Sequence, residues 1–166
     1  AEKNHWTREK NSNWYEYKEQ ADEFFYKWYS TYPGINYIVN DAPMPDGKQL
    51  WFRVEVEHRL FAGFCVFDPK AASEEGQGDQ VDEYDGETEK AVEHYLKISA
   101  AGHKDWWATR WYLPAGEQKP NDSVPNFKIM NDAAIALADK ECRSEFVSLC
   151  VRNIEEMVER VLAIPE

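Results

Sequence analysis

Four side chains that can bind metal ions or move protons lie close together in the sequence: Asp46, Glu55, Glu57 and His58. Glu55 and Glu57 are two residues apart, so on a β-strand they leave the same face. A carboxylate pair on a hairpin strand, with an upstream aspartate, can hold the metal ions of a two-metal nuclease. Such centres usually carry a lysine two places after the glutamate, and that position here is Glu57. A nuclease using Asp46, Glu55 and Glu57 is the alternative to a solvated strand face neutralised by Arg53.

Tryptophan and arginine side chains form the second candidate group. Planar rings beside guanidinium groups can stack on a base or a sugar. Core packing with cation–π contacts is the competing interpretation of the same residues. The candidate ligand-binding residues are Trp51, Arg53, Trp106, Arg110 and Trp111, with Trp107 and Tyr112 in the same group.

Motifs of the common enzyme classes are missing from the sequence, which has no GxGxxG, GxxxxGK[ST], GxSxG or HExxH. An EF-hand built around Gly86 would need an aspartate at position 81 and a glutamate at position 92, where the chain has Val81 and Val92. We therefore expect no resident metal or cofactor. Whether the chain is an enzyme stays open, and a non-catalytic role is favoured.

The charge balance bears on possible partners. The 166 residues carry 31 acidic and 19 basic side chains, a net charge of −12. Because nucleic-acid binding depends on phosphate contacts by Lys and Arg, direct binding of nucleic acid is disfavoured. The same charge favours another alternative, an acidic protein that presents a DNA-like surface to a basic partner.

The cysteines and the apolar runs indicate a cellular compartment. Three cysteines without CxxC spacing favour a reducing environment, and no apolar run approaches the roughly 20 residues that span a bilayer. The polar start of the chain does not resemble a signal peptide. We expect a cytoplasmic chain without membrane association, excised from a larger protein.

The strongest structural signal is the stretch 49–68. Apolar and polar residues alternate up to Glu57, which predicts a strand with one buried and one wetter face. A reversal at His58 and Arg59 precedes a nearly continuous apolar run, typical of a strand covered on both sides. The predicted core of this hairpin is Leu50, Phe52, Val54, Val56, Phe61, Phe64, Val66 and Phe67.

The remaining elements are predicted from periodicity and capping residues. Together they predict a single α+β domain over 1–166, with an antiparallel sheet of about four strands and with an N-terminal helix and C-terminal helices packed on it. Besides the hairpin, the predicted elements are a helix from Asn13 to before Pro33, a strand at 35–39, an acidic mobile loop at 69–86, a helix at 87–101 capped by Asp85, a strand at 105–113, a short helix at 130–138 and a long helix from 139.

The order of four segments carries a family resemblance: FFYKWY, FRVEVEHRLFAGF, WWATRWYLP and the helical stretch from NFKIMND to VERV. In this order the chain, from about Asn13 to Leu162, resembles the C-terminal accessory region that follows the catalytic domain in some PD-(D/E)XK nuclease superfamily proteins of bacteria and phages. The resemblance implies a role in DNA processing or defence and a catalytic domain upstream. It transfers no catalytic residue. The expected function is a non-catalytic interaction or specificity domain, whose partner is another protein or the rest of the parent chain.

Overall fold

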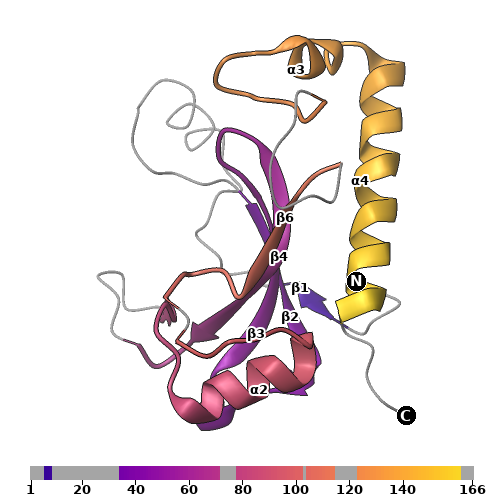
Figure 1. The fold of residues 1–166 in the computed structure, drawn as a ribbon. Coiled ribbons are helices and arrows are strands. Elements are labelled where there is room, and N and C mark those ends of the chain that lie inside the picture. The colour runs from indigo at the N-terminus through magenta and orange to yellow at the C-terminus, as the bar shows by residue number, and fades with distance from the viewer. Residues whose placement is uncertain (1–5, 9–33, 72–77, 103, 115–122, 162–166) are drawn as a thin grey trace.

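A computed structural model of the chain describes residues 6–8, 34–71, 78–102, 104–114 and 123–161 (Figure 1). The described residues form an antiparallel sheet with three α-helices around it, so the predicted α+β class is confirmed. The helix predicted from Asn13 lies outside the described residues.

Six strands make up the sheet within this part of the chain, rather than the predicted four or so. The order runs β1-β2-β3-β4, and the far edge of β4 pairs with β5 near one end and with β6 near the other. The strands are β1 (Thr7–Arg8), β2 (Gly34–Pro43), β3 (Gln49–Val56), β4 (Leu60–Asp68), β5 (Asp79–Gln80) and β6 (Thr109–Tyr112).

The predicted central hairpin is confirmed as β3 and β4. Their register is continuous from the Gln49–Phe67 pair to the Val56–Leu60 pair, so every residue of β3 has a partner on β4. The chain reverses at Glu57–Arg59, where the Glu57 amide donates to the Arg59 carbonyl oxygen at 3.1 Å. The hydrophobic alternation sets this register, because a slip by one residue would turn every side chain to the wrong face.

The helices are α2 (Gly86–Leu96), α3 (Asp132–Ala136) and α4 (Lys140–Val161). Asp85 caps α2 as predicted, with its Oδ1 accepting from the Thr88 amide at 2.8 Å. The helix ends about one turn earlier than predicted, because Lys97 adopts a left-handed conformation with φ 54°.

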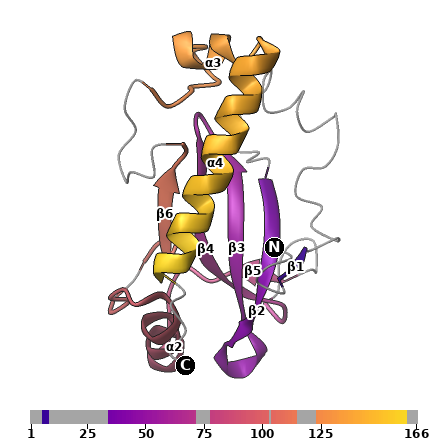
Figure 2. The same ribbon diagram turned by 90° about the vertical axis from the view of Figure 1, so that its right-hand side faces the viewer.

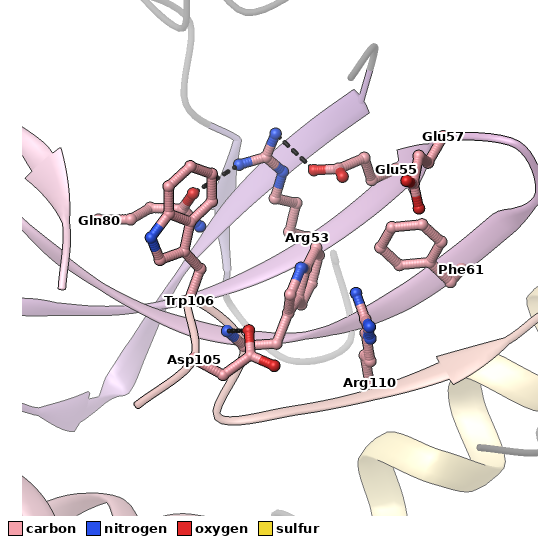
Figure 3. A pocket seen from close by; sticks show the side chains of 9 residues that line it. Arg53, Glu55, Glu57, Phe61, Gln80, Asp105, Trp106 and Arg110 are labelled. Carbon is pink, nitrogen blue, oxygen red and sulfur yellow. Dashed lines mark hydrogen bonds and ion pairs between the residues drawn. The ribbon is translucent and has the colours of Figure 1, made fainter. Parts of the chain in front are cut away.

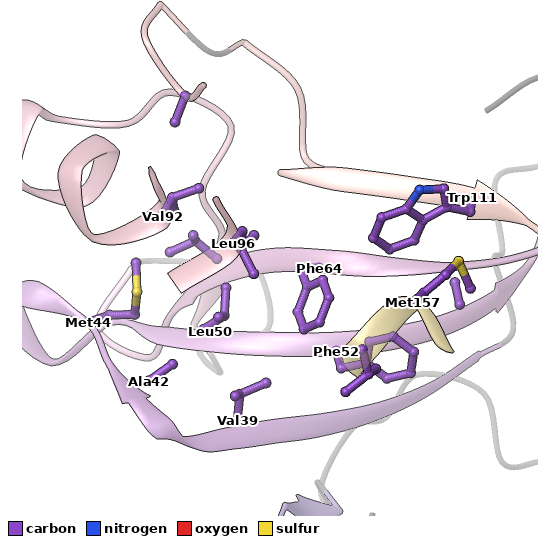
Figure 4. Packing of buried hydrophobic residues seen from close by; sticks show 14 of the residues in the cluster. Val39, Ala42, Met44, Leu50, Phe52, Phe64, Val92, Leu96, Trp111 and Met157 are labelled. Carbon is purple, nitrogen blue, oxygen red and sulfur yellow. The ribbon is translucent and has the colours of Figure 1, made fainter. Parts of the chain in front are cut away.

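The main core lies between one face of the sheet and two helices, α2 and α4. Figure 2 shows α4 crossing in front of the sheet, and α2 sits at one end. Of the predicted hairpin core, Leu50, Phe52, Phe64 and Val66 are in this layer, whereas Val54 and Val56 are half-buried. The helices add Val92, Leu96, Cys150, Met157 and Val158, and β6 adds Trp111 (Figure 4).

The side chains on the opposite sheet face are less exposed to solvent than predicted. The sequence indicated a solvated face for β3, yet Arg53 and Glu55 are only 2% and 5% exposed. Phe61 and Phe67 from β4 are buried on this side as well, because strand alternation places them opposite Phe64 and Val66. Both faces of the central hairpin are therefore covered, although the two covering layers differ in chemistry.

The predicted strand at 105–113 is shorter than expected, since β6 begins only at Thr109. The residues before it turn across the second sheet face, and Trp107 lies edge-on to Phe61 with ring centroids 5.2 Å apart. Gly63 makes this approach possible. A Cβ at Gly63 would lie 2.1 Å from the Thr109 carbonyl oxygen and 2.9 Å from the Trp107 ring. A missing side chain on β4 thus lets β6 and the tryptophan segment pack closely.

The predicted acidic loop at 69–86 contains a strand that the sequence did not indicate. Within its described residues, β5 pairs with Phe67 and Asp68 of β4. The Val81 amide continues the contact by donating to the Val66 carbonyl oxygen at 2.9 Å. This pairing matters for the site because it places Gln80 beside Arg53.

Candidate functional site

A pocket of about 150 Å³ opens on the second sheet face (Figure 3). Side chains from β3, β4, β5 and β6 form its walls together with the segment that precedes β6. The lining residues are Arg53, Glu55, Glu57, Phe61, Gln80, Asp105, Trp106, Trp107 and Arg110. Aromatic rings, guanidinium groups, carboxylates and one amide thus meet in a single small space.

A buried ion pair forms the floor of this pocket. Arg53 and Glu55 leave the same face of β3, and Arg53 Nη2 lies 2.5 Å from Glu55 Oε2. Arg53 Nη1 also donates to Gln80 Oε1 at 3.2 Å, and its guanidinium lies 5.8 Å from the centre of the Trp107 ring. A charge-assisted bond, an amide and an aromatic face therefore fix the orientation of Arg53.

Glu55 has an unusual acidity because of this environment. Burial raises the pKa of its carboxyl to about 7, and the Glu57 carboxylate raises it further, while Arg53 and Arg110 oppose the rise. The free energy lost when a carboxylate is removed from water exceeds the free energy gained from its attraction to one guanidinium group. Near neutral pH the pocket therefore holds a carboxyl group that can either donate or accept a hydrogen bond.

The outer part of the pocket is more open. Trp106 is 52% exposed, and the Arg110 guanidinium lies 5.5 Å from the centre of the Phe61 ring. Asp105 Oδ1 accepts from the Trp107 amide at 3.2 Å, which holds the tryptophan pair in its turn. The exposed indole of Trp106 can therefore stack on a planar group, while polar atoms of the same pocket contact the edge of that group.

Three of the five candidate ligand-binding residues lie in this pocket: Arg53, Trp106 and Arg110. Trp51 lies outside it and stacks on Phe67, with ring centroids 4.0 Å apart. Trp111 lies on the opposite sheet face, in the main core. The separation of Trp111 from Arg110 follows from strand geometry, since neighbouring residues point to opposite faces.

The three carboxylates of the nuclease alternative do not meet. Asp46 lies in the turn Pro45–Gly47 at the start of β3, with its carboxylate 3.7 Å from Lys48 Nζ. Glu55 is near the other end of β3, and six steps of extended strand from Gln49 span roughly 20 Å. Within the described residues, no group of three His, Cys, Asp or Glu side chains could hold a metal ion. Of the three carboxylates that the nuclease alternative needs together, only Glu55 and Glu57 line the pocket, and Asp46 does not.

Two polar residues of the pocket, Gln80 and Asp105, are not among the candidate residues that the sequence indicates. Gln80 lies in the stretch that is predicted to be a solvated loop, and no local pattern marks it as a partner of Arg53. Asp105 precedes the two tryptophans, and its position two residues before Trp107 is typical of a side chain that accepts from the backbone in a turn. That spacing could have indicated a turn in place of a strand.

No protein-family model, no curated protein and no solved structure matches the chain. No α-helix among the described residues combines the length and the apolar character needed to span a membrane.

Proposed function

We propose that the chain is a non-catalytic interaction domain that binds one compact, planar, polar group in the pocket around Arg53 and Trp106. The observation that carries this proposal is the convergence of Arg53, Trp106 and Arg110 on a single cavity with a buried carboxyl group. Pockets for drug-sized ligands usually measure about 300–1,000 Å³. A volume of about 150 Å³ suits one ring system, such as a nucleobase.

The arrangement of side chains favours a planar ring over a flexible chain. Trp106 offers a half-exposed indole face, and base–aromatic stacking contributes about 1–3 kcal/mol. In the same pocket, a hydrogen bond between the guanidinium of Arg53 and the amide of Gln80 holds both groups in place, so they can meet the edge of a ring without losing much freedom. The Glu55 carboxyl adds a group that matches ring N–H donors when ionised.

The charges in the pocket favour a neutral ligand. The described lining residues carry two guanidinium groups and three carboxyl groups, so they offer no excess of positive charge to a phosphate. The net charge of −12 also repels the phosphate backbone of a nucleic acid. We therefore expect recognition of a base or nucleoside, or of a similar ring presented by a partner, and not of a long phosphate chain.

The resemblance to accessory regions of nuclease-superfamily proteins agrees with this role. An accessory domain needs a recognition site and no reaction of its own. In that setting the pocket would supply specificity, while another domain of the parent chain would supply catalysis.

Titration with the four ribonucleosides, followed by tryptophan fluorescence and by the indole N–H signals in NMR spectra, tests the proposal. We expect at least one nucleoside to bind and to shift the Trp106 signal. Trp106→Ala should weaken binding by about 10- to 100-fold, the loss expected for one stacking partner. Ile129→Ala is the matched control, because Ile129 is 73% exposed and does not line the pocket.

Two results would count against the proposal. Binding that is unchanged in Trp106→Ala would place the ligand elsewhere on the protein. Binding of nucleotides in proportion to their number of phosphates would show charge recognition, which the composition of the pocket does not favour.

A further inference from the structure

A second cavity, independent of the pocket above, lies on the opposite face of the sheet between α4 and strands β2 to β4, with Trp6 also in its lining. It measures about 730 Å³, within the range of small-molecule sites. Figure 2 shows the long helix crossing in front of the sheet. Apart from two glutamates, the described lining residues are apolar or aromatic, and they come from both the helix and the strands.

The cavity leaves apolar side chains exposed. Val147 and Val151 are 52% and 51% exposed on α4, and Ile35 is 39% exposed on the facing strand. Scattered exposed apolar residues are ordinary, whereas several around one concave space mark a binding site. Met157 of α4 is buried in the main core together with residues of the sheet, so the helix is packed onto this face of the sheet.

The charges of the cavity indicate what kind of molecule it takes. Among the described lining residues, the only charged side chains are two carboxylates, Glu155 and Glu159, which lie one turn apart toward the end of α4. The carboxyl end of a helix also carries partial negative charge. Aromatic rings line the same cavity, including Trp6, whose ring lies 5.3 Å from that of Phe52. Carboxylates and ring faces together attract ammonium groups and repel anions.

We propose that this cavity binds a small apolar molecule whose polar end is a cationic ammonium group. The hydrocarbon part lies against Val147, Val151 and the sheet, and the cation lies near the exposed carboxylate of Glu159. A fatty acid carries the opposite charge, so this carboxylate repels it. The site uses the other sheet face from the planar-ligand pocket, and the two sites share none of their described lining residues.

Three probes that share a ten-carbon chain but differ in headgroup charge test separately whether the cavity binds a hydrocarbon chain and whether it prefers a cationic headgroup. Decyltrimethylammonium, decanol and decanoate are titrated into the full chain below their micellar concentrations, with isothermal calorimetry as the readout. We expect the cation to bind best and decanoate at least about tenfold more weakly than the cation, because the charge of its headgroup is reversed. Failure of all three probes to bind would overturn the proposal.

Variants on α4 locate the binding. Val151→Gln should lower the affinity for decyltrimethylammonium and for decanol alike by about tenfold, since it places an amide against the hydrocarbon chain. Ile135→Gln is the control, because Ile135 is 55% exposed on α3 and lies outside the cavity. Circular dichroism of both variants establishes that each is folded. Equal binding by the two variants would show that the cavity is not the site.

Glu159→Gln tests the headgroup. It should weaken binding of the cation by about threefold to tenfold and leave the affinity for decanol unchanged. The assignment of an ammonium group would be overturned if decanoate bound as tightly as decyltrimethylammonium. It would also be overturned if Glu159→Gln left the affinity for both charged probes unchanged.

Discussion

Replacement of Glu55 by glutamine should remove a specific part of the pH dependence of stability. Glu55 is buried, so the pKa of its carboxyl rises from 4.5 to about 7 in the folded protein. In the unfolded chain the carboxyl ionises near pH 4.5, while in the folded protein it keeps its proton until about pH 7. The unfolded state therefore loses its proton first as the pH rises, and the folded state loses stability over that interval.

The magnitude follows from the size of the shift. A rise from 4.5 to about 7, at 1.36 kcal/mol for each pKa unit, corresponds to about 3 kcal/mol. Below about pH 4 the carboxyl is protonated in both states, so Glu55→Gln and the wild type should be nearly equal in stability. Above about pH 7 the variant should be more stable by about 3 kcal/mol, because it has no buried carboxylate to ionise.

Urea unfolding between pH 4 and pH 8, followed by tryptophan fluorescence, measures this difference. Subtracting the two free energies of unfolding at each pH cancels the titration of the other groups. Glu145→Gln is the control, since Glu145 is exposed on α4. A wild-type-minus-variant difference that stays constant across the pH range would refute the reasoning, because it would mean that Glu55 ionises as easily in the folded protein as in the unfolded chain.

Four further predictions concern stability, thiol accessibility and activity. Asp85→Ala should lower the free energy of unfolding by about 1 kcal/mol, because it removes the cap of α2. Hydrogen bonds from Lys48 and from the helix hold the pKa of Asp85 low, so the wild type should progressively lose this stabilisation as the pH falls below about 4, as urea unfolding can measure. Gly63→Ala should cost about 3 kcal/mol or prevent folding, as its new Cβ would meet backbone atoms of β6, and Gly102→Ala, with open space around it, should show a smaller loss. A maleimide should label exposed Cys142 in the folded protein and leave the two buried cysteines unmodified, as mass spectrometry can establish. Plasmid DNA should stay intact with Mg²⁺ or Mn²⁺, and cleavage that Glu55→Ala abolishes would argue against a non-catalytic role.

The parts of the fold that could be predicted depend on neighbours in the sequence. The hairpin of β3 and β4 follows from alternating side chains and a short reversal, and the start of α2 follows from the side chain of Asp85. Helix α4 follows from an apolar stripe with helical spacing. In each case the residues that decide the structure lie within one hairpin or one helix, so the local pattern contains the information.

The pocket could be predicted only in part, for a physical reason. Alternation along β3 shows that Arg53 and Glu55 share a face, but it does not show whether another segment covers that face. The cover consists of Gln80, 27 residues after Arg53, and of the Trp106 turn, which is farther still along the chain. Sequence therefore determined which side chains could act together, and tertiary packing decided that the pair is buried, that the pKa of Glu55 rises and that Asp46 is left out.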